Sequence, residues 1–524
     1  MNKMFFAAIA AAVCAASADT VYTWTRQVKA ADNYYHFNET GNWQNGAVPQ
    51  SGDDVILDFG TISAARNLKN DIAGLRIRGY RINADPSAAI VNIYGNKLTL
   101  VGTGGGTNDC DSIRTGSGPF YLHTDVEIVG DYYYKTTGGR TYLKGAVTSD
   151  SSASFHSHGA TCNFDGDWSG FAGVRKMESG TPCFTSEAGA PAAVPLYMKA
   201  ANRPALRFEM GGNTGHSPII FDEAVPSGYS FLTVYSSGGA WDGDITIPQG
   251  TQGLTLTVAL KVNKTFSFAG AFLEASAASL AVNLDTNSDG IIAFTGDKEF
   301  TPQALNALGS GTVLLARPLT NPRTIVRAFG NATVRMGIAN AFACGNEFRF
   351  GSSTYAAIGT LDLNGFDQTI KAINTEGTAA SNSDRTGFTI TSATEATLSI
   401  TNSARICAVV ADKAIVRAVG CRLTTLPATV ALSTGGFAAS GNNGLIDFTG
   451  CDAVNSAARL HLSNGGKVVV PSGVTLAFSQ IFVNGSALKA GTYSAEDLPD
   501  FIVAGGGSIR AILSGPVVQG DTFT

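Results

Sequence analysis

The chain has 524 residues, of which 61 are glycine, a larger share than the roughly 7% of an average protein. Charged residues make up 15% of the chain, where an ordinary soluble domain has about 25%, hydrophobic residues make up 44%, and the formal net charge is −5. This composition excludes an intrinsically disordered chain, and it gives no electrostatic reason to bind nucleic acid or anionic lipid.

The first 18 residues have the pattern of a secretory signal peptide. A short basic start at Lys3 precedes an apolar run over residues 4–13, and Ala16-Ser17-Ala18 provides the small residues of a cleavage site. We therefore expect cleavage after Ala18 and an exported protein. No later stretch reaches the roughly 18 uncharged apolar residues of a membrane helix, so we expect no membrane-spanning segment.

Removal of the signal peptide leaves seven of the eight cysteines, which form no CxxC motif and no Cys/His cluster, so we expect no structural zinc site. An odd number leaves at least one thiol outside any intramolecular disulfide. The pairs to be tested as disulfides are Cys162 with Cys183 and Cys407 with Cys421. The alternative is that all these cysteines are buried thiols.

Short stretches in which apolar residues alternate with Thr, Ser or Asn predict β-strands with one buried face, and they include residues 98–100, 254–258, 279–284, 361–363, 396–400 and 474–476. Asn-Gly pairs at 45–46, 364–365, 464–465 and 484–485 predict turns with a left-handed backbone. Helical patterns are scarce. We predict one short helix over 301–309, with Thr301 as its cap and Pro302 at its first position, and one helical turn over 494–498.

Short strands at intervals of about eight to twelve residues fit either a sandwich array or a solenoid, and the length and low charge of the chain favour the solenoid. We predict an all-β fold, a right-handed parallel β-helix with roughly 20–25 residues per coil. Its expected parts are a signal peptide (1–18), an N-terminal opening or cap segment (19–60), a β-helix repeat region (61–480) and a C-terminal closing segment (481–524).

Four segments carry a resemblance to a known family. Trp24, with Gly41-Asn42-Trp43 and the run 46–55, resembles the opening segment of bacterial exported β-helix proteins with autotransporter-associated β-strand repeats. Residues 163–173 and 359–370 are similar to two units of those repeats, and residues 483–509 resemble their closing unit. The resemblance implies a β-helix displayed on, or shed from, a bacterial surface. The chain looks like a passenger without a translocation barrel, which implies another route across the outer envelope.

Paired carboxylates are the candidates for catalysis, because glycoside hydrolysis uses two carboxyl groups about 5–10 Å apart. Two Asp-Gly-Asp motifs place two carboxylates on one strand face beside a tryptophan that could stack on a sugar: Asp165, Asp167 and Trp168, and Asp242, Asp244 and Trp241. The first motif lies inside a repeat unit, which favours a structural role. Tyr133 is a further candidate for a glycan contact, although a ladder of stacked rings explains the run 132–134 equally well.

The run 285–290 has oxygen ligands at the first, third and fifth positions of a loop, Asp285, Asn287 and Asp289, as a calcium loop does. The twelfth position, which should be a bidentate Glu, is Gly296, and strands are predicted on both sides instead of helices. A plain polar turn and a weak calcium site both remain open. His156 and His158 share one strand face, but a metal there would need further ligands.

These observations favour a non-enzymatic, secreted or cell-surface β-helix that is structural or adhesive and presents repeated polar ladders to extracellular glycans or cell-surface components. Self-association is a further option, and calcium is the one cofactor considered. The alternatives are a polysaccharide-degrading β-helix enzyme, a lyase or glycoside hydrolase, and a carbohydrate-binding module. A groove lined by acids and aromatic residues would favour the enzyme, whereas flush ladders of Thr, Ser and Asn would favour the first hypothesis.

Overall fold

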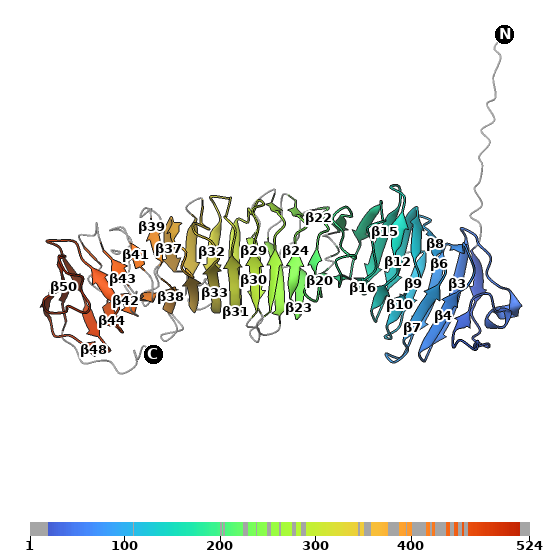
Figure 1. Ribbon diagram of the computed structural model, residues 1–524, viewed down its shortest axis with the longest axis horizontal. Coiled ribbons are helices and arrows are strands. Elements are labelled where there is room, and N and C mark those ends of the chain that lie inside the picture. The colour runs from blue at the N-terminus through green and yellow to red at the C-terminus, as the bar shows by residue number, and fades with distance from the viewer. Residues whose placement is uncertain are drawn as a thin grey trace, which may run out of the picture. The chain divides into compact units, whose positions relative to one another are not determined.

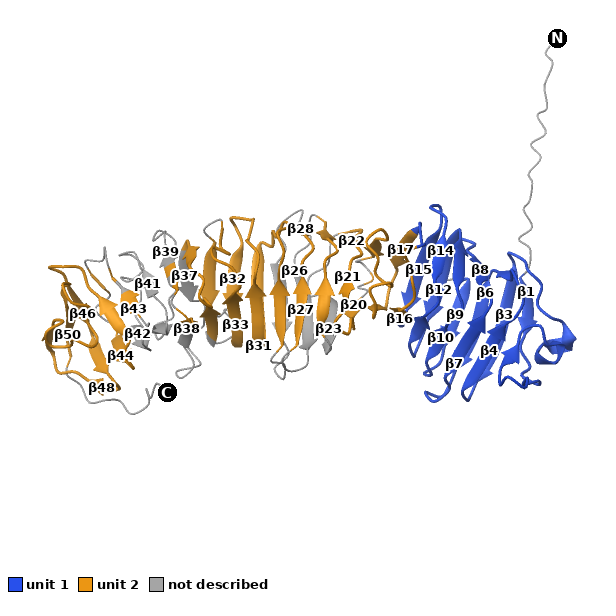
Figure 2. Ribbon diagram, in the orientation of Figure 1, with its two compact units in different colours: residues 1–162, 170–173 blue, residues 163–169, 174–524 orange. Residues whose placement is uncertain are grey.

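The computed structural model confirms the predicted all-β solenoid: 2% of the chain is helical, and parallel sheets stack as a β-solenoid of about 13 turns. The chain divides into two compact units, residues 1–162 with 170–173 and residues 163–169 with 174–524 (Figure 2). The structure describes residues 19–107, 109–199, 202, 205–223, 229–236, 238–248, 253–260, 264–274, 279–284, 290–343, 346–350, 358–375, 387–392, 394, 396–400, 415–419, 422–424, 436–440, 445–448, 453–454 and 459–513.

Three parallel sheets form the solenoid of unit 1, and successive strands of the chain belong to different sheets (Figure 1). The first sheet contains β1 (Thr20–Thr23), β3 (Val55–Ile62), β6 (Gly79–Ala84), β9 (Ser112–Thr115), β12 (Asp131–Thr136) and β15 (Ser154–Gly159). The second contains β2 (Tyr35–His36), β4 (Arg66–Asn70), β7 (Val91–Gly95), β10 (Phe120–Leu122) and β13 (Thr141–Leu143). The third contains β5 (Arg76–Ile77), β8 (Leu98–Val101), β11 (Val126–Val129) and β14 (Val147–Ser149). β16 (Thr161–Phe164) runs from unit 1 into unit 2.

Unit 2 also consists of stacked parallel strands. One set contains β17 (Val174–Met177), β19 (Leu196–Met198), β22 (Ile219–Phe221), β25 (Ile245–Ile247) and β28 (Phe272–Glu274). A second contains β18 (Thr181–Phe184), β20 (Leu206–Phe208), β23 (Tyr229–Ser236), β26 (Gly253–Leu260), β29 (Ser279–Leu284), β31 (Ala304–Leu315), β32 (Ile325–Ala328), β34 (Glu347–Phe350) and β37 (Ala372–Thr375). Ala304 pairs with Ile325 and Ile325 with Glu347, which gives turns of 21 and 22 residues, within the predicted range. Thr360 pairs with Thr389, a turn of 29 residues, so other turns are longer than predicted.

The remaining strands of unit 2 form a further parallel set and two smaller sheets. The further set contains β21 (Thr214–Gly215), β24 (Gly239–Trp241), β27 (Thr265–Phe268), β30 (Ile291–Phe294), part of β31, β33 (Asn331–Met336), β35 (Ile358–Asp362), β38 (Gly387–Thr391), β40 (Ile415–Val419), β42 (Gly436–Ser440), β44 (Arg459–Ser463) and β47 (Gln480–Val483). The smaller sheets contain β36 (Gln368–Ile370), β39 (Thr397–Ile400), β41 (Arg422–Thr424), β43 (Leu445–Asp447) and β45 (Lys467–Val469), and β46 (Thr475–Phe478), β49 (Gly491–Tyr493) and β50 (Ser508–Ala511).

Alternation of buried and outward side chains builds the core, because successive residues of a strand point to opposite faces. On β10, Phe120 and Leu122 are buried while Tyr121 between them faces outward. Asn364 and Gly365, which follow β35, have φ of 50° and 82°, and the other three Asn-Gly pairs are left-handed in the same way. The turns predicted at these pairs are therefore confirmed.

The predicted helix over 301–309 is wrong, because β31 begins at Ala304 in its place. The Thr301 hydroxyl donates to the carbonyl oxygen of Phe272, at 3.0 Å, instead of capping a helix. Leu305 and Ala307 are both fully buried, which is the period of a strand, and β31 pairs in parallel with β29 and β32. The predicted turn at 494–498 is confirmed by the hydrogen bond from Leu498 N to Ser494 O, at 3.0 Å.

Non-solenoid elements flank the parallel strands. Before β3, the 3-10 turns η1 (Thr40–Asn42) and η2 (Gln44–Gly46) bring Trp43 against Trp24, with ring centroids 4.9 Å apart. At the other end of the described chain, β48 (Ser486–Ala487) folds back antiparallel on β47, and β49 pairs antiparallel with β50. Among the residues that the structure describes, no helix is long and apolar enough to cross a membrane.

Candidate functional site

Outward side chains on the second sheet of unit 1 form two parallel rows. Asn67 pairs with Asn92, Asn92 with Tyr121, and Tyr121 with Tyr142, so these residues follow one another from turn to turn. The second row lies two residues further along each strand, on the same side of the sheet, because side chains alternate. We call both rows together the Tyr–Asn face: Tyr34, His36, Asn67, Lys69, Asn92, Tyr94, Tyr121, His123, Tyr142 and Lys144.

The aromatic rings of this face stack on one another. Tyr94 lies on His123 with centroids 4.3 Å apart and an interplanar angle of 9°, and Tyr121 lies on Tyr142 at 4.4 Å and 12°. Tyr121 and His123 connect the two pairs at 6.0 Å. Because the rings cover one another, the stacked faces are not open to a ligand. The three tyrosines of the ladder, Tyr94, Tyr121 and Tyr142, are half-buried.

A lysine lies over a tyrosine at either end of the ladder. Lys69 Nζ is 5.4 Å from the centroid of the Tyr34 ring, and Lys144 Nζ is 5.8 Å from that of Tyr142. Tyr34 in turn makes an edge-to-face contact with Tyr94, at 5.5 Å. These cation–π contacts are worth roughly 0.5–1 kcal/mol each at exposed sites, so they fix the end rings more than they stabilise the fold.

The amide groups continue the ladder as hydrogen bonds. Asn92 Nδ2 donates to Asn67 Oδ1 at 3.0 Å, and His123 Nε2 lies 3.1 Å from Asn92 Oδ1. Because an amide oxygen only accepts, the hydrogen of His123 is placed on Nε2. Burial, followed by the nearby Lys144, lowers the pKa of His123 below its ordinary value. The imidazole is therefore neutral at pH 7.

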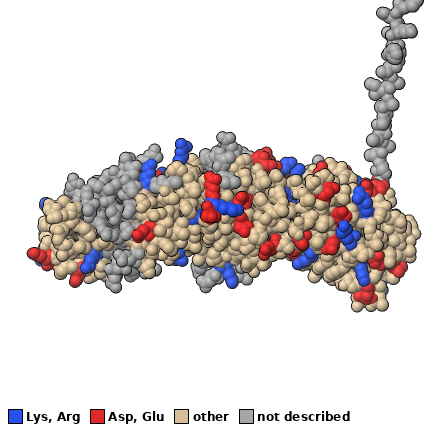
Figure 3. All heavy atoms as spheres, turned by 45° about the horizontal axis from the view of Figure 1, so that its top comes forward, with Lys and Arg blue, Asp and Glu red and all other residues tan. Residues whose placement is uncertain are grey.

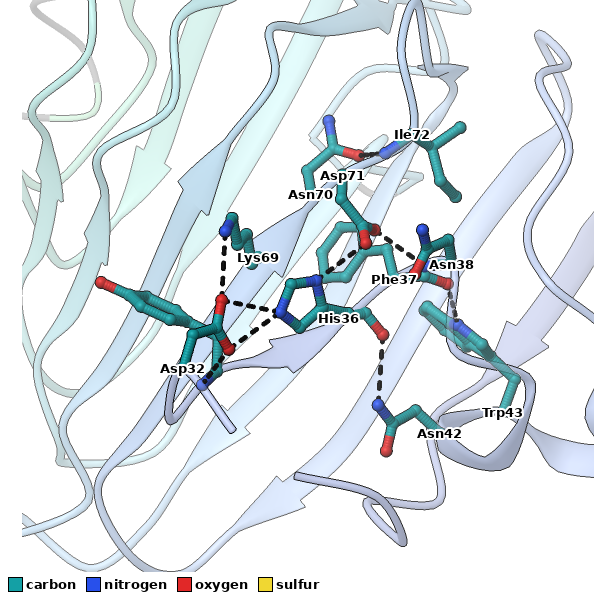
Figure 4. A network of polar contacts seen from close by, with 11 residues as sticks. Asp32, His36, Phe37, Asn38, Asn42, Trp43, Lys69, Asn70, Asp71 and Ile72 are labelled. Atoms are coloured by element: carbon teal, nitrogen blue, oxygen red, sulfur yellow. Dashed lines mark hydrogen bonds and ion pairs between the residues drawn. The ribbon is translucent and has the colours of Figure 1, made fainter. Parts of the chain in front are cut away.

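One end of the Tyr–Asn face is tied to the segment before β3 by an ionic network (Figure 4). His36 Nδ1 lies 2.8 Å from Asp71 Oδ2, and His36 Nε2 lies 3.0 Å from both oxygens of Asp32, which also binds Lys69 at 3.2 Å. The hydrogen bond to His36 lowers the pKa of Asp32 to about 2, and that same bond raises the pKa of His36. Asp71 Oδ1 also accepts from Asn38 N, at 2.9 Å.

The two rows repeat one chemical pattern that the sequence carries but that we did not recognise there. Each strand has an outward polar or aromatic residue, a buried leucine or isoleucine, and a second outward residue: residues 67–69 (NLK), 92–94 (NIY), 121–123 (YLH) and 142–144 (YLK). Since the intervals between the triplets are uneven, a search for a fixed period does not find them. Alignment of the triplets on their central apolar residue would have found the face.

Trp168 and Trp241, predicted to contact a glycan, lie in the core of unit 2 with no exposed surface. The Trp168 ring packs against Phe164 and lies under the guanidinium of Arg175, while Trp241 stacks on Phe208 at 4.5 Å. Burial alternates along both segments, so these rings point inward while Asp167 is exposed and Asp242 is half-buried. Neither ring presents a face to a sugar, so this prediction is wrong.

Tyr133 lies on the outer side of β12 and stacks on His156, with centroids 4.0 Å apart and an interplanar angle of 16°. The stacked-ring alternative therefore describes it, since the ring face toward His156 is covered. His156 Nε2 lies 2.7 Å from Ser154 Oγ, and Ser154 Oγ also donates to Asp131. The single serine proton points to Asp131, so the imidazole donates to the serine and does not act as its base. In a hydrolase triad, by contrast, the serine donates to the histidine and the histidine donates to the aspartate.

Of the predicted acidic pairs, Asp167, Asp242 and Asp244 each bind a different partner. Asp167 Oδ1 accepts from Ser169 N at 2.8 Å, and this bond lowers the pKa of Asp167. Asp242 Oδ1 lies 2.6 Å from His216 Nδ1, whereas Asp244 Oδ1 binds Lys298 Nζ at 2.8 Å. Burial acts to raise the pKa of Asp244, but Lys298 and a backbone N–H outweigh it and lower that pKa. A general acid needs a raised pKa, so neither shift favours acid catalysis.

The candidate calcium ligands Asp285, Asn287 and Asp289 lie outside the described residues. Within the described part of the chain, no three His, Cys, Asp or Glu side chains are grouped to hold a metal ion. Cys110, Cys162 and Cys183 are buried thiols, so the disulfide between Cys162 and Cys183 is not formed. Cys407 and Cys421 lie outside the described residues.

Comparison with known proteins adds no relative. No protein-family model matches the chain, and neither a curated protein nor a solved structure matches it.

Proposed function

We propose that this protein is an exported, non-catalytic β-solenoid that adheres to extracellular glycans through the Tyr–Asn face. The observation that carries the proposal is the repetition on that face, where successive turns each offer outward hydrogen-bonding groups. Parallel strands lie about 4.8 Å apart, so the array is regular and stiff. A ligand that repeats along its own length meets many weak contacts at once, and their combined avidity far exceeds each single contact.

The chemistry of the face favours a hydroxyl-rich ligand. Tyrosine hydroxyls and asparagine amides both donate and accept hydrogen bonds, and neutral His123 adds no charge. Asp32 and Asp71 are held by His36 at one end of the face. Charged side chains elsewhere are scattered among uncharged ones on the side seen in Figure 3. Between Lys69, which binds Asp32, and Lys144 at the other end, the face is polar and uncharged, and an array of this kind suits a glycan.

We further infer that the chain is displayed on or shed from a bacterial surface and belongs with the exported β-helix proteins that carry autotransporter-associated repeats. The repeat-like segment 359–370 supports this proposal. Leu361 and Leu363 are buried, Asn364-Gly365 forms the corner, and Gln368 Nε2 donates to Ile338 O at 2.7 Å in the adjacent turn. These five residues of the unit thus each have a structural role.

A glycan array of the protein from residue 19 tests adhesion. We expect retention on one class of neutral glycan, and Tyr121→Ala is expected to weaken it at least fivefold, because an uncharged hydrogen bond contributes about 1 kcal/mol. The matched control is Tyr197→Ala, which removes a half-buried outward tyrosine from β19 of unit 2. If both variants lost glycan binding equally, or if Tyr121→Ala bound as well as the unchanged protein, the Tyr–Asn face would be rejected as the binding surface.

Product analysis on the retained glycans separates adhesion from the alternative of a polysaccharide-degrading enzyme. We expect the glycans to be recovered intact. Newly released reducing ends or unsaturated products would overturn the proposal, and Asp242→Asn and Asp244→Asn would then show whether these aspartates act as acid and base.

A further inference from the structure

The residue after the predicted cleavage site is held in an ionic cluster of unit 1. Asp19 directly precedes β1, and its Oδ1 lies 2.6 Å from Arg78 Nη1. The same guanidinium donates from Nη2 to Asp109 at 3.1 Å and from Nε to Asp111 at 3.2 Å. Arg78 is therefore shared by three carboxylates, one directly before β1 and two from the segment before β9.

The inner part of this cluster is buried. The Arg78 side chain is 9% exposed and that of Asp111 is not exposed at all. Asp111 also accepts from the Thr103 hydroxyl at 2.7 Å and from Tyr133 N at 2.9 Å. Burial acts to lower the pKa of Arg78, but the hydrogen bonds to Asp19 and Asp111 raise it above its ordinary value. The guanidinium is thus permanently charged and fixed in place.

Negative charge is in excess around Asp19, because one guanidinium faces three carboxylates. A fourth carboxylate lies beside the next residue: Thr20 Oγ1 donates to Asp54 Oδ2 at 3.2 Å, and Thr20 N donates to Asp54 O at 3.0 Å. Opposite charges within a few ångströms favour the charged form of both groups. This site would therefore stabilise one more cation, and Asp19, whose amino group cleavage would free, already has its carboxylate in the cluster.

We propose that cleavage of the Ala18–Asp19 bond supplies this cation, and that the α-ammonium group of Asp19 then fastens β1 to unit 1. In this step a signal peptidase adds water across the amide bond. Ala18 leaves as a carboxylate, and the proton of its new carboxyl group passes to the amine of Asp19, which becomes the ammonium. The proposal rests on export of the protein but not on glycan binding. Cleavage would thereby change the structure, because the new ammonium group adds a positive charge to a cluster that has excess negative charge in the precursor.

The test compares two full-length mature proteins, residues 19–524, one with a free amino group on Asp19 and one with that group acetylated. At pH 6 we expect the free form to melt about 2 °C higher, in line with the small contribution of a partly exposed ion pair. The difference should vanish as pH rises past the pKa of the α-amino group, which we expect above its usual value of about 7.7–8.0. Sequencing of the exported protein should begin at Asp19.

Two variants make the comparison specific. Asp109→Asn removes an exposed carboxylate of the cluster. It should reduce the difference in melting temperature between the free and the acetylated protein. Asp150→Asn, which removes an exposed aspartate bound to Ser152, should leave that difference unchanged. Equal melting temperatures of the free and acetylated proteins at pH 6, or export with a different first residue, would overturn the proposal. Both forms should bind glycan alike, so failure here leaves the adhesive function standing.

Discussion

At the scale of single residues, buried arginine side chains donate hydrogen bonds to carbonyl oxygens at the corners of the solenoid. Arg175 in unit 2 has no exposed surface, and its guanidinium donates to Gly189 O at 2.8 Å and to Val194 O at 2.7 Å. Burial lowers its pKa to about 9. Arg317 donates to Gly270 O at 2.8 Å in the same manner. Because corner carbonyls have no neighbouring strand to bind, these side chains supply the missing donors.

Replacement of Arg175 should therefore destabilise unit 2. We expect Arg175→Met to lower the free energy of unfolding by about 2–3 kcal/mol, since buried carbonyl oxygens lose their donors while the long apolar chain keeps the volume. Denaturant unfolding measures the change. Arg323→Met, at an exposed arginine of the same unit, should stay within about 0.5 kcal/mol. A neutral result at Arg175 would contradict the role of the guanidinium as a corner donor.

The His36 network makes the amino-terminal part of unit 1 sensitive to pH. The folded pKa of His36 is raised above 6.5, mainly by its bond to Asp32. Its contribution to stability is therefore fully present below pH 6.5 and is lost as pH rises through the raised pKa. We expect the melting temperature to fall across this window, and to fall less in His36→Gln. An NMR titration of labelled histidines that gave His36 a pKa below 6.5 would contradict this prediction.

At the scale of elements, tertiary pairing decided the identity of β31. Its first half pairs with β29, and from Ser310 onward it pairs with β33, so one continuous strand turns between two sheets. The bend falls at Gly309 and Gly311, whose φ values are 91° and 101°. The local propensity of Thr301-Pro302 favours the start of a helix. As a strand, however, the segment forms backbone hydrogen bonds with parallel neighbours on both sides, and this pairing outweighs the local propensity.

Gly311 tests this account of the bend. We expect Gly311→Ala to lower the free energy of unfolding by roughly 1–3 kcal/mol, because a β-carbon is strained at a positive φ. Gly491→Ala is the matched control, since a β-carbon there meets no atom closer than 3.8 Å and the φ is not positive. Thermal and denaturant unfolding of both variants should separate backbone strain from the simple addition of a methyl group.

At the scale of the whole molecule, a solenoid must close its ends, because an unpaired edge strand can pair with another chain. In unit 1 the segment before β3 packs Trp43 onto Trp24 and Phe37, and Trp43 Nε1 donates to Phe37 O at 2.7 Å. In unit 2 the last strands fold back as antiparallel pairs. Both arrangements replace the parallel ladder with a structure that does not extend it.

Loss of the aromatic cluster should open the end of unit 1. Trp43 is 2% exposed, and we expect Trp43→Ala to destabilise the unit by about 3–5 kcal/mol and to promote association through exposed strands. Light scattering together with unfolding would detect both effects. Tyr493→Ala, at a half-buried residue of the closing segment, should change neither the stability nor the association of the protein by much. A monomeric, equally stable Trp43→Ala protein would show that the cluster does not cap the solenoid.

The sequence alone determined the all-β class, the parallel solenoid and the Asn-Gly corners. These features depend on alternation between neighbouring residues and on backbone freedom at glycine, which are local properties. Residues 361–365 illustrate this, since their burial and turn follow directly from their order.

Only the tertiary structure decided which side chains of different turns meet. It buried Trp168 and Trp241, separated the partners of Asp242 and Asp244, and aligned Tyr94, Tyr121 and Tyr142 into one face. The physical reason is that the register between turns depends on uneven loop lengths and on packing across the core. A shift by one residue would reverse every side chain of a strand, so the Tyr–Asn face is a property of the assembled stack.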